Sequence, residues 1–322
     1  MLGALLGLFA IVVWGVTVVN TRALLVDFSS LEIMVIRFVL AWFVLWVMSP
    51  REFKFVTLFG GRRTVLTYRI YAWMGLCGVA LYQFTENCAI HYTNASNVAI
   101  LMSLSPIVTA VMAKVFLKDR NLGIWMWVGS IMAISGGILV GADNIRDLHL
   151  DPLGDFMVLV TIVCWGVYSL LMDRTNHVRV SALVVVRKAF FWSLVAILPV
   201  AVWGTTGSGQ AALDGSFAIN LDPAVNRARF GNFWNLFNLV FLGVFASALA
   251  FSAWNLASKR LGMVKANVGL YLMPVVGVVA AALFLGERIT LPVILGGLLI
   301  LAGVAVASVN PMRKVGFQGA KE

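Results

Sequence analysis

The chain contains 322 residues, of which 61% are hydrophobic and 12% are charged, and its mean hydropathy is +0.94. An ordinary soluble domain is roughly 45–50% apolar, so this composition excludes a soluble protein and predicts an integral membrane protein. The formal net charge of +10 would suggest nucleic acid as a partner of a soluble protein. In a membrane protein the position of each charge matters more than the sum, so we expect no nucleic-acid partner.

Ten apolar segments are long enough to cross the bilayer as helices, because about 20 apolar residues span its hydrocarbon core. They lie at roughly 2–20, 31–48, 70–90, 95–117, 123–141, 153–172, 181–203, 234–258, 263–285 and 290–309. Only the connections 49–69, 142–152 and 204–233 are long enough to hold any additional structure. A soluble catalytic domain is therefore excluded.

The distribution of Lys and Arg predicts the orientation of the chain. If the N-terminus is cytoplasmic, 15 of these residues fall in cytoplasmic connections and five in outer ones, and the acidic run from Asp143 to Asp155 lies outside. The positive-inside rule then places both termini in the cytoplasm. The first segment lacks the basic start and clear cleavage site of a signal peptide, so we expect it to be retained. The predicted location is a bacterial plasma (inner) membrane.

The two halves of the chain repeat the same residues in the same order. Trp14-Gly15 recurs as Trp165-Gly166, and Arg37 recurs as Arg187, at spacings of 151 and 150 residues. At a spacing of 168 the pairs are Gly75 with Gly243, Asn87 with Asn255, Pro106 with Pro274, Arg120 with Arg288, and Gly129 with Gly297. A single insertion in the polar stretch 204–231 accounts for the change in spacing.

Each copy holds five spans, and because five is odd the second copy enters the membrane inverted. An inverted repeat is the commonest plan of a secondary transporter. The predicted fold is therefore all-α and integral to the membrane, with ten transmembrane helices in two five-helix inverted repeats. The first repeat covers 1–141, the second covers 151–311, and a cytoplasmic tail covers 312–322.

A family resemblance rests on this ordered set of residues, which occurs twice. It comprises W-G near the end of the first helix, an arginine within the second, a proline-containing fourth helix and a glycine-rich fifth. The fourth-helix segments read YTNASNVAILMSLSPIVTAVMAKVFLKDR and LGMVKANVGLYLMPVVGVVAAALFLGER, and the fifth helices contain VGSIMAISGGILVG and LGGLLILAGVAVA. From about residue 3 to 309 the chain resembles the drug/metabolite transporter superfamily, in particular its EamA-type members. It departs in reading Lys118-Asp119-Arg120 where Gly286-Glu287-Arg288 keeps the usual pattern.

The resemblance implies a carrier of small metabolites, often amino acids exported from the cytoplasm. It also implies a central cavity lined mainly by the first, third and fourth helices of each repeat. The resemblance does not name the cargo.

Three charged side chains, Arg37, Glu86 and Arg187, are predicted inside the spans, where an ionisable group needs a partner, water or a task. Glu86 is the only carboxylate well inside a span, and the helical rise places it in the same layer as Arg37. Three interpretations are open. The two side chains form a static ion pair, or Glu86 contacts a substrate amine or carries a coupling proton. In the third, the side chains snorkel to the lipid edge. We expect Arg187 to face the bundle and Lys188 to snorkel.

Polar and aromatic residues recur at matching positions on the helices expected to line the cavity. Aromatic walls with a few placed polar groups hold small amphipathic ligands, and rings also engage a cationic amine. Packing or a place in the interfacial belt is the alternative for Trp14 and Trp165, and interhelical hydrogen bonding is the alternative for Asn87 and Asn255. The candidate substrate-binding residues are Trp14, Thr17, Tyr82, Glu86, Asn87, Ser103, Trp165, Tyr168, Trp254, Asn255 and Tyr271.

Backbone features add two further expectations. Pro106 and Pro274 interrupt their spanning helices and are candidate hinges for alternating access, with a static kink as the alternative. Small residues at four-residue spacing, namely Gly129, Ala133, Gly137 and Gly141, give the fifth helix a stripe for close packing. The stripe faces a helix of the same bundle or of a second subunit, so a monomer and a homodimer both remain open.

These features favour a secondary active transporter that moves a small amphipathic metabolite, an amino acid or a related compound or drug, and exports it by alternating access. A nucleotide-sugar or phosphorylated-metabolite exchanger of the same superfamily is the alternative. The three histidines and three cysteines form no catalytic or metal-spaced cluster, so an enzyme is disfavoured, and the spans lack a channel's polar rings. We expect no metal and no cofactor, with a small-molecule substrate, the lipid bilayer and a coupling proton as partners.

Overall fold

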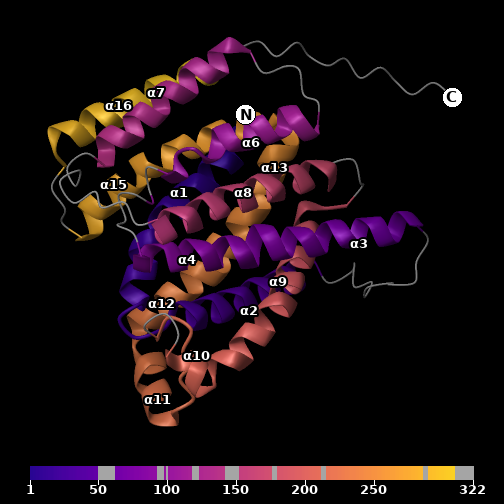
Figure 1. Cartoon of the computed structure of the whole chain (residues 1–322), viewed down its shortest axis with the longest axis vertical. Coiled ribbons are helices and arrows are strands. Elements are labelled where there is room, and N and C mark those ends of the chain that lie inside the picture. The colour runs from indigo at the N-terminus through magenta and orange to yellow at the C-terminus, as the bar shows by residue number, and fades with distance from the viewer. Residues whose placement is uncertain are drawn as a thin grey trace.

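The structure, a computed structural model, describes residues 1–49, 62–92, 98, 101–117, 123–141, 152–175, 180–211, 215–285 and 289–308. These residues form helices and no strand (Figure 1). In chain order the helices are α1 (Leu2–Leu24), α2 (Ser30–Met48), α3 (Arg62–Gly75), η2 (Leu76–Leu81), α4 (Tyr82–Tyr92), α6 (Ser105–Phe116), α7 (Ile124–Gly141), α8 (Pro152–Thr175), α9 (Ala182–Gly204), α10 (Gly207–Ala211), α11 (Pro223–Gly231), α12 (Phe233–Val240), η5 (Phe241–Leu249), α13 (Ala250–Leu261), α14 (Met263–Val268), η6 (Gly269–Leu272), α15 (Met273–Leu285) and α16 (Leu291–Ser308).

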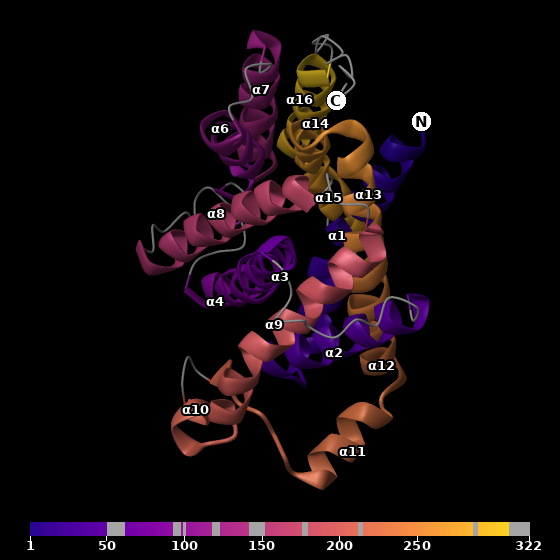
Figure 2. The same cartoon turned by 90° about the vertical axis from the view of Figure 1, so that its right-hand side faces the viewer.

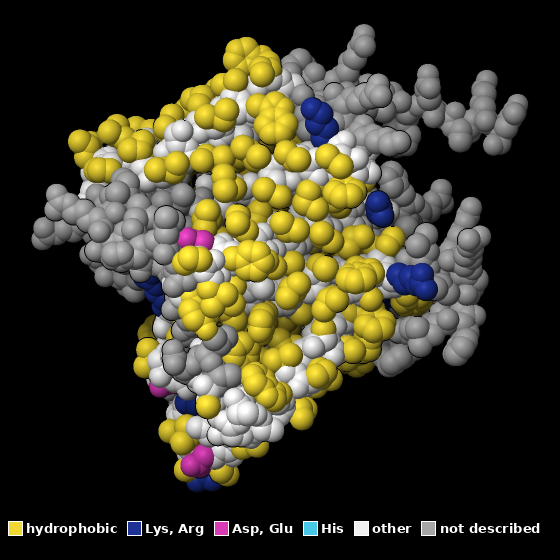
Figure 3. All heavy atoms as spheres, viewed as in Figure 1, with side chains coloured by type: hydrophobic (Ala, Val, Ile, Leu, Met, Phe, Trp, Pro, Cys, Tyr) yellow, Lys and Arg dark blue, Asp and Glu magenta, His cyan; other side chains and the backbone are white. Residues whose placement is uncertain are grey.

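Within the described part of the chain, seven helical stretches are long and apolar enough to cross a membrane. They are Leu2–Leu24, Ser30–Met48, Pro152–Thr175, Ala182–Gly204, Phe233–Leu261, Met263–Ala280 and Leu291–Ser308, with shorter apolar helices at Ser105–Phe116 and Ile124–Val140. Hydrophobic side chains cover the broad middle of the face in Figure 3, and the charged side chains visible there lie at its margins. The structure agrees with the prediction of an all-helical membrane protein. The ten spans, their inverted repeat and their orientation stay predictions.

Two long rods each contain a π-helical segment. In the rod from α3 to α4 the π segment is η2, and in the rod from α12 to α13 it is η5. The rod that contains η2 packs against α8 and α9, whereas η5 packs against α1 and α2. Backbones approach closely at both segments, because a Cβ on Gly75 would lie 2.3 Å from the carbonyl oxygen of Ala189, and one on Gly243 would lie 2.6 Å from Cβ of Leu40. Each half of the chain therefore packs through this rod onto the first two helices of the other half.

Both predicted proline positions lie just after a break in the helix. Pro106 occupies the first turn of α6, immediately after a turn at Ser103 and Leu104. Pro274 lies near the start of α15, after the 3₁₀ segment η6. Proline suits the first turn of a helix because its missing N–H is not needed there. The interruption that the sequence predicts is present in the backbone, and movement about it stays a prediction.

Helices α7 and α16 form a closely packed pair at one end of the molecule (Figures 1 and 2). A Cβ on Gly303 would lie 2.6 Å from both the Gly129 carbonyl oxygen and the Ala133 amide, and Gly136 meets Gly296 in the same way. The predicted small-residue stripe thus packs within the chain, with Gly136 in the contact. Gly137 instead faces Ser103.

The polar stretch that follows α9 folds back onto the start of α2. Arg229 and Glu32 form a bidentate ion pair, with Nη2 to Oε1 at 2.6 Å and Nη1 to Oε2 at 2.8 Å, and both side chains are buried. Glu32 also closes the capping box of α2 with Ser29. The ring of Phe217 from the same stretch lies 5.1 Å from the ring of Phe84 on α4. We call residues 215–231 the strap.

Candidate functional site

Three tryptophans from three different helices meet in the core. Trp14 comes from α1, Trp165 from α8 and Trp254 from α13. The ring centroids are 5.7 Å apart between Trp14 and Trp165, 5.4 Å between Trp14 and Trp254, and 6.1 Å between Trp165 and Trp254. All three side chains are buried. The sequence predicted each of these residues singly, and the fold brings them together.

Three further rings complete what we call the aromatic cluster. Tyr82 on α4 lies 5.6 Å from Trp165, and Tyr168 stacks on Trp165 at 5.4 Å. Phe251, which the sequence did not single out, lies 5.2 Å from Trp14 and 5.9 Å from Tyr168. It precedes Trp254 by three residues on the same face of α13, and this spacing could have revealed it. Edge-to-face and offset pairs of this kind stabilise aromatic packing.

Hydrogen bonds fix the polar edges of the aromatic cluster. The Trp14 indole N–H donates to the carbonyl oxygen of Ala246 in η5 at 2.9 Å, and the Trp165 indole N–H donates to Oδ1 of Asn267 at 2.8 Å. Asn255 donates through Nδ2 to the Tyr168 hydroxyl at 2.8 Å. Asn267 was not predicted, and no local pattern marks it.

The Trp254 indole nitrogen differs from those of its neighbours. Its side chain is fully buried, and its N–H has no acceptor among the described residues. A buried donor without an acceptor carries an energetic cost, which a ligand oxygen can remove.

A charged group borders the aromatic cluster at Tyr82, because Glu86 lies one turn further along α4 and the two side chains interact electrostatically. Arg37 on α2 is buried and donates from Nε to the Ser247 hydroxyl at 2.5 Å and from Nη1 to Oε1 of Gln83 at 2.8 Å. Nε2 of Gln83 in turn lies 3.5 Å from Oε2 of Glu86. Gln83 therefore contacts both charged side chains and lies between them, and the roles of Arg37 and Glu86 stay predictions.

Arg187, the counterpart of Arg37 in the second half, lies at a different place and performs a different task. It is buried, and its Nη1 donates to the carbonyl oxygen and the hydroxyl of Ser49, the residue that ends α2. Ser49 is 12 residues from Arg37 along this helix, which corresponds to about 18 Å. Lys188 does not simply extend toward lipid headgroups, because its Nζ lies over the rings of Tyr68 and Tyr71 at 5.1 and 4.9 Å.

Four of the predicted site residues lie outside these contacts. The Thr17 hydroxyl donates to the carbonyl oxygen of Trp14 in its own helix at 2.6 Å. Tyr271 belongs to a separate buried group that includes Met263 and Ile300. Ser103 lies beside Gly137, and Asn87 is partly buried on α4.

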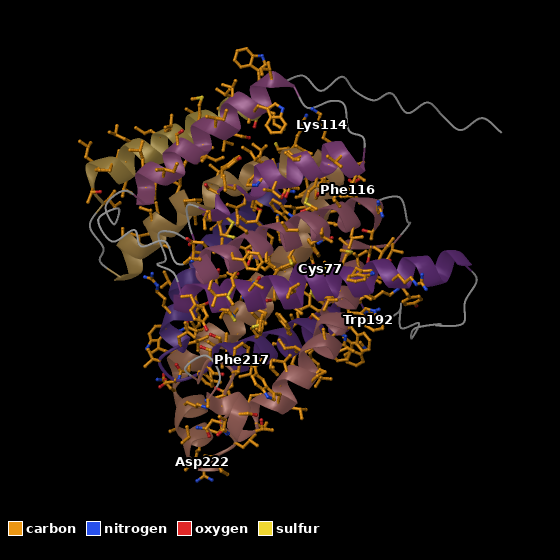
Figure 4. The ribbon with its side chains drawn as sticks, viewed as in Figure 1. Cys77, Lys114, Phe116, Trp192, Phe217 and Asp222 are labelled. Atoms are coloured by element: carbon orange, nitrogen blue, oxygen red, sulfur yellow. The ribbon has the colours of Figure 1, made fainter. Side chains whose placement is uncertain are left out.

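Figure 4 gives the wider setting of the site. Cys77 of η2 lies in the middle of the bundle, Phe217 lies toward the end that holds Asp222, and Lys114 lies near the opposite end. The three cysteines are free, and no group of three His, Cys, Asp or Glu side chains that could hold a metal occurs among the described residues.

An all-helical chain with several apolar spans and a buried aromatic core defines the class of multi-pass membrane proteins. The model of the EamA-like transporter family matches residues 1–142 and again 152–309, and the chain belongs to this family. Membership gives it a general role as a transporter.

Individual relatives agree with this class. The chain is 23% identical to a probable amino-acid metabolite efflux pump of Escherichia coli (strain K12), with 94% of this chain and 93% of the relative covered. It is 27% identical to a probable terminal-alkyne amino-acid exporter of Streptantibioticus cattleyicolor, with 71% and 69% covered. A crystal structure with 18% sequence identity superposes with a TM-score of 0.74 over 97% of this chain and 99% of the other, so the fold is shared.

Proposed function

We propose that this protein is a secondary active transporter that exports a small amphipathic metabolite, an amino acid or a related compound or drug, across a bacterial inner membrane. The observation that carries the proposal is the aromatic cluster, which in the described part of the chain is bordered by the Glu86 carboxylate and the Arg37 guanidinium. Relatives named as an amino-acid exporter and as an amino-acid metabolite efflux pump support the substrate class.

The chemistry of the cluster suits a ligand with an apolar body and a charged amino group. Rings of Trp14, Trp165 and Tyr82 offer flat apolar surfaces and attract a cation at their faces. Glu86 borders Tyr82 and supplies a negative charge for an ammonium group or a coupling proton. The Trp254 indole N–H supplies a donor for a carboxylate. A zwitterion with an apolar side chain uses all three features.

A carrier of phosphorylated compounds is the second candidate, and the placement of the basic side chains disfavours it. Phosphate is held best by clustered Arg and Lys side chains. Arg37 binds Gln83 and Ser247, while Arg187 binds Ser49 about 18 Å along α2. Arg37 and Arg187 therefore do not form the cluster of basic side chains that would hold a phosphate group.

Two observations support transport by rocking of two inverted five-helix halves. The family model matches the chain in two consecutive segments, and the π-containing rod of each half packs against the first two helices of the other. Consecutive helical pieces, such as α14, η6 and α15, join into single spans in the ten-span arrangement with both termini in the cytoplasm. Pro106 and Pro274, each beside a helix break, are the proposed hinges.

The decisive experiment uses three probes that share one ring. Purified protein in proteoliposomes is assayed by counterflow with L-phenylalanine, 2-phenylethylamine and 3-phenylpropanoate, which are a zwitterion, a cation and an anion. We expect L-phenylalanine to be transported best and Trp165→Ala to abolish transport. Trp125→Ala, at a tryptophan that is 53% exposed on α7, is the matched control and retains activity. If the protein transported a sugar nucleotide and none of the three probes, the proposal would be refuted.

A further inference from the structure

Gln83 occupies the space between the two opposite charges of the site. It lies on α4 one turn before Glu86, and only 8% of its surface is exposed. Its carbonyl oxygen accepts the Nη1–H of Arg37 at 2.8 Å, and its amide nitrogen approaches Oε2 of Glu86 at 3.5 Å. Within the described residues the ion pair belongs to Arg229 and Glu32, and no direct contact joins Arg37 to Glu86.

The amide is suited to this place because it accepts at one end and donates at the other. The N–H group that Arg37 donates fixes the orientation of the Gln83 amide. If the amide were turned around, its NH2 group would face the guanidinium N–H with no acceptor between them. A direct ion pair at hydrogen-bond distance would occupy the carboxylate and cancel its charge locally. With Gln83 between them, Glu86 is approached by the neutral amide donor of Gln83, and the guanidinium of Arg37 makes no direct contact with it. The carboxyl oxygens of Glu86 are therefore not occupied by the guanidinium.

We propose that Gln83 is a positioning residue that holds Arg37 away from Glu86, so that the Glu86 carboxylate can bind the ammonium group of a substrate. The identity of the ligand rests on the proposed transport function, whereas the separation of the two charges does not. Arg37 also donates to Ser247 of η5, so Gln83 links Glu86 to the contact between α2 and η5. Among the described residues, Tyr82 and Arg37 are the other titratable or charged groups near Glu86.

The first test needs no substrate and measures labelling of Glu86 by dicyclohexylcarbodiimide, which modifies carboxyl groups in apolar surroundings. Labelling is located by peptide mass spectrometry, with Glu86→Gln as the blank. In Gln83→Leu we expect Arg37 to contact Glu86 directly, and a charge pair at about 4 Å is strong enough to slow labelling by about tenfold or more. Removing the guanidinium as well, in Arg37→Leu/Gln83→Leu, restores the rate.

Two further variants separate positioning from packing. Gln83→Glu gives Arg37 its own carboxylate and sets a like charge beside Glu86, which then holds its proton more firmly, so Glu86 is labelled at least as fast as in the parent even if Gln83→Leu folds poorly. Gln210→Leu, at an exposed glutamine on α10, is the matched control and has no effect. Unchanged labelling in Gln83→Leu, no recovery in the double variant, or no labelling of Glu86 in the unmodified protein would each overturn the inference.

The second test measures binding of 2-phenylethylamine and 3-phenylpropanoate to the same variants. In Gln83→Leu the affinity for the amine falls by about tenfold, since a charge-assisted contact of this size is lost, while the affinity for the acid does not fall. The double variant recovers amine binding, an outcome that a purely structural role would not produce. Labelling that follows the expected pattern without transport of any probe would refute the proposed function and leave the role of Gln83 intact.

Discussion

At the scale of single residues, Tyr168 shows how tightly the site is built around its rings. It stacks on Trp165, accepts a hydrogen bond from Asn255 and is fully buried. Its ring also leaves no room on the side of η2, because a Cβ on Gly78 would lie 2.1 Å from Cδ2 and 2.5 Å from Cβ of Tyr168. The position of Tyr168 therefore requires that residue 78 has no side chain.

We expect Gly78→Ala to displace Tyr168 and to lower stability by about 1–3 kcal/mol, the usual cost of overpacking a core. The midpoint of thermal unfolding in detergent, followed by size-exclusion fluorescence, measures the effect, and counterflow of L-phenylalanine measures its consequence for transport. Gly7→Ala is the matched control, because a Cβ there meets only Ala257 at an ordinary 3.6 Å. Equal behaviour of the two variants would contradict this account.

The relative positions of single residues were predictable from the sequence where helical spacing alone defines them. The rise per residue places Arg37 and Glu86 in one layer, and the four-residue spacing of Tyr82 and Glu86 puts them on one face. Gln83 and Ser247 escaped prediction, since their roles depend on how α2, α4 and η5 meet. The sequence predicted that Arg187 faces the bundle. It did not predict the partner Ser49, because that residue lies 138 residues away in the chain.

At the scale of elements, the pair formed by α7 and α16 depends on backbone contact. The glycines of both helices let the two backbones meet directly, as small residues do in membrane helix pairs. The sequence revealed the stripe on one helix. It left open which helix would face the stripe, because a partner subunit and a helix of the same bundle require the same small residues.

We expect Gly303→Ala to push α7 and α16 apart, because the added Cβ would lie 2.6 Å from two backbone atoms of α7. Backbone cannot move aside as a flexible side chain does, so we predict a loss of about 1–3 kcal/mol in stability. The unfolding midpoint in detergent measures the loss. Gly297→Ala, with its nearest neighbour at 4.0 Å, serves as control and should stay near the parent value. An equal drop in both variants would show that glycine itself, rather than the contact, matters here.

At the scale of the whole molecule, the strap joins the two halves at the end of the bundle that holds α10 and α11 (Figures 1 and 2). Besides the ion pair with Glu32, Arg229 binds Asn226 and lies 4.6 Å above the ring of Phe28. The Ser29 hydroxyl donates to the carbonyl oxygen of Ala218, and just after the strap Asn235 of α12 donates to Asp27. The sequence identified this stretch only as an insertion, because its contacts lie close to 200 positions back along the chain.

We expect Arg229→Met to destabilise the protein by about 3–5 kcal/mol, because it leaves Glu32 charged and unpaired in a buried position. Glu32→Gln/Arg229→Met should recover part of the loss, since a neutral amide avoids the unpaired charge and its oxygen can still accept a hydrogen bond from Ser29 or Asn220. Thermal unfolding in detergent distinguishes the two variants. Arg227→Met is the control, at an exposed arginine of the same helix. A double variant less stable than Arg229→Met would contradict a pairwise role of the two charges.

The strap also sets an order for biosynthesis. Glu32 leaves the ribosome 197 residues before Arg229 does, which at 5–20 residues per second is a delay of roughly 10–40 s. During that interval Glu32 has no Arg229 to pair with, because that residue has not yet been synthesised. Until Arg229 emerges, the Glu32 carboxylate therefore needs water or another polar partner. Truncated chains that end before residue 229 should be the preferred substrates of membrane quality-control proteases.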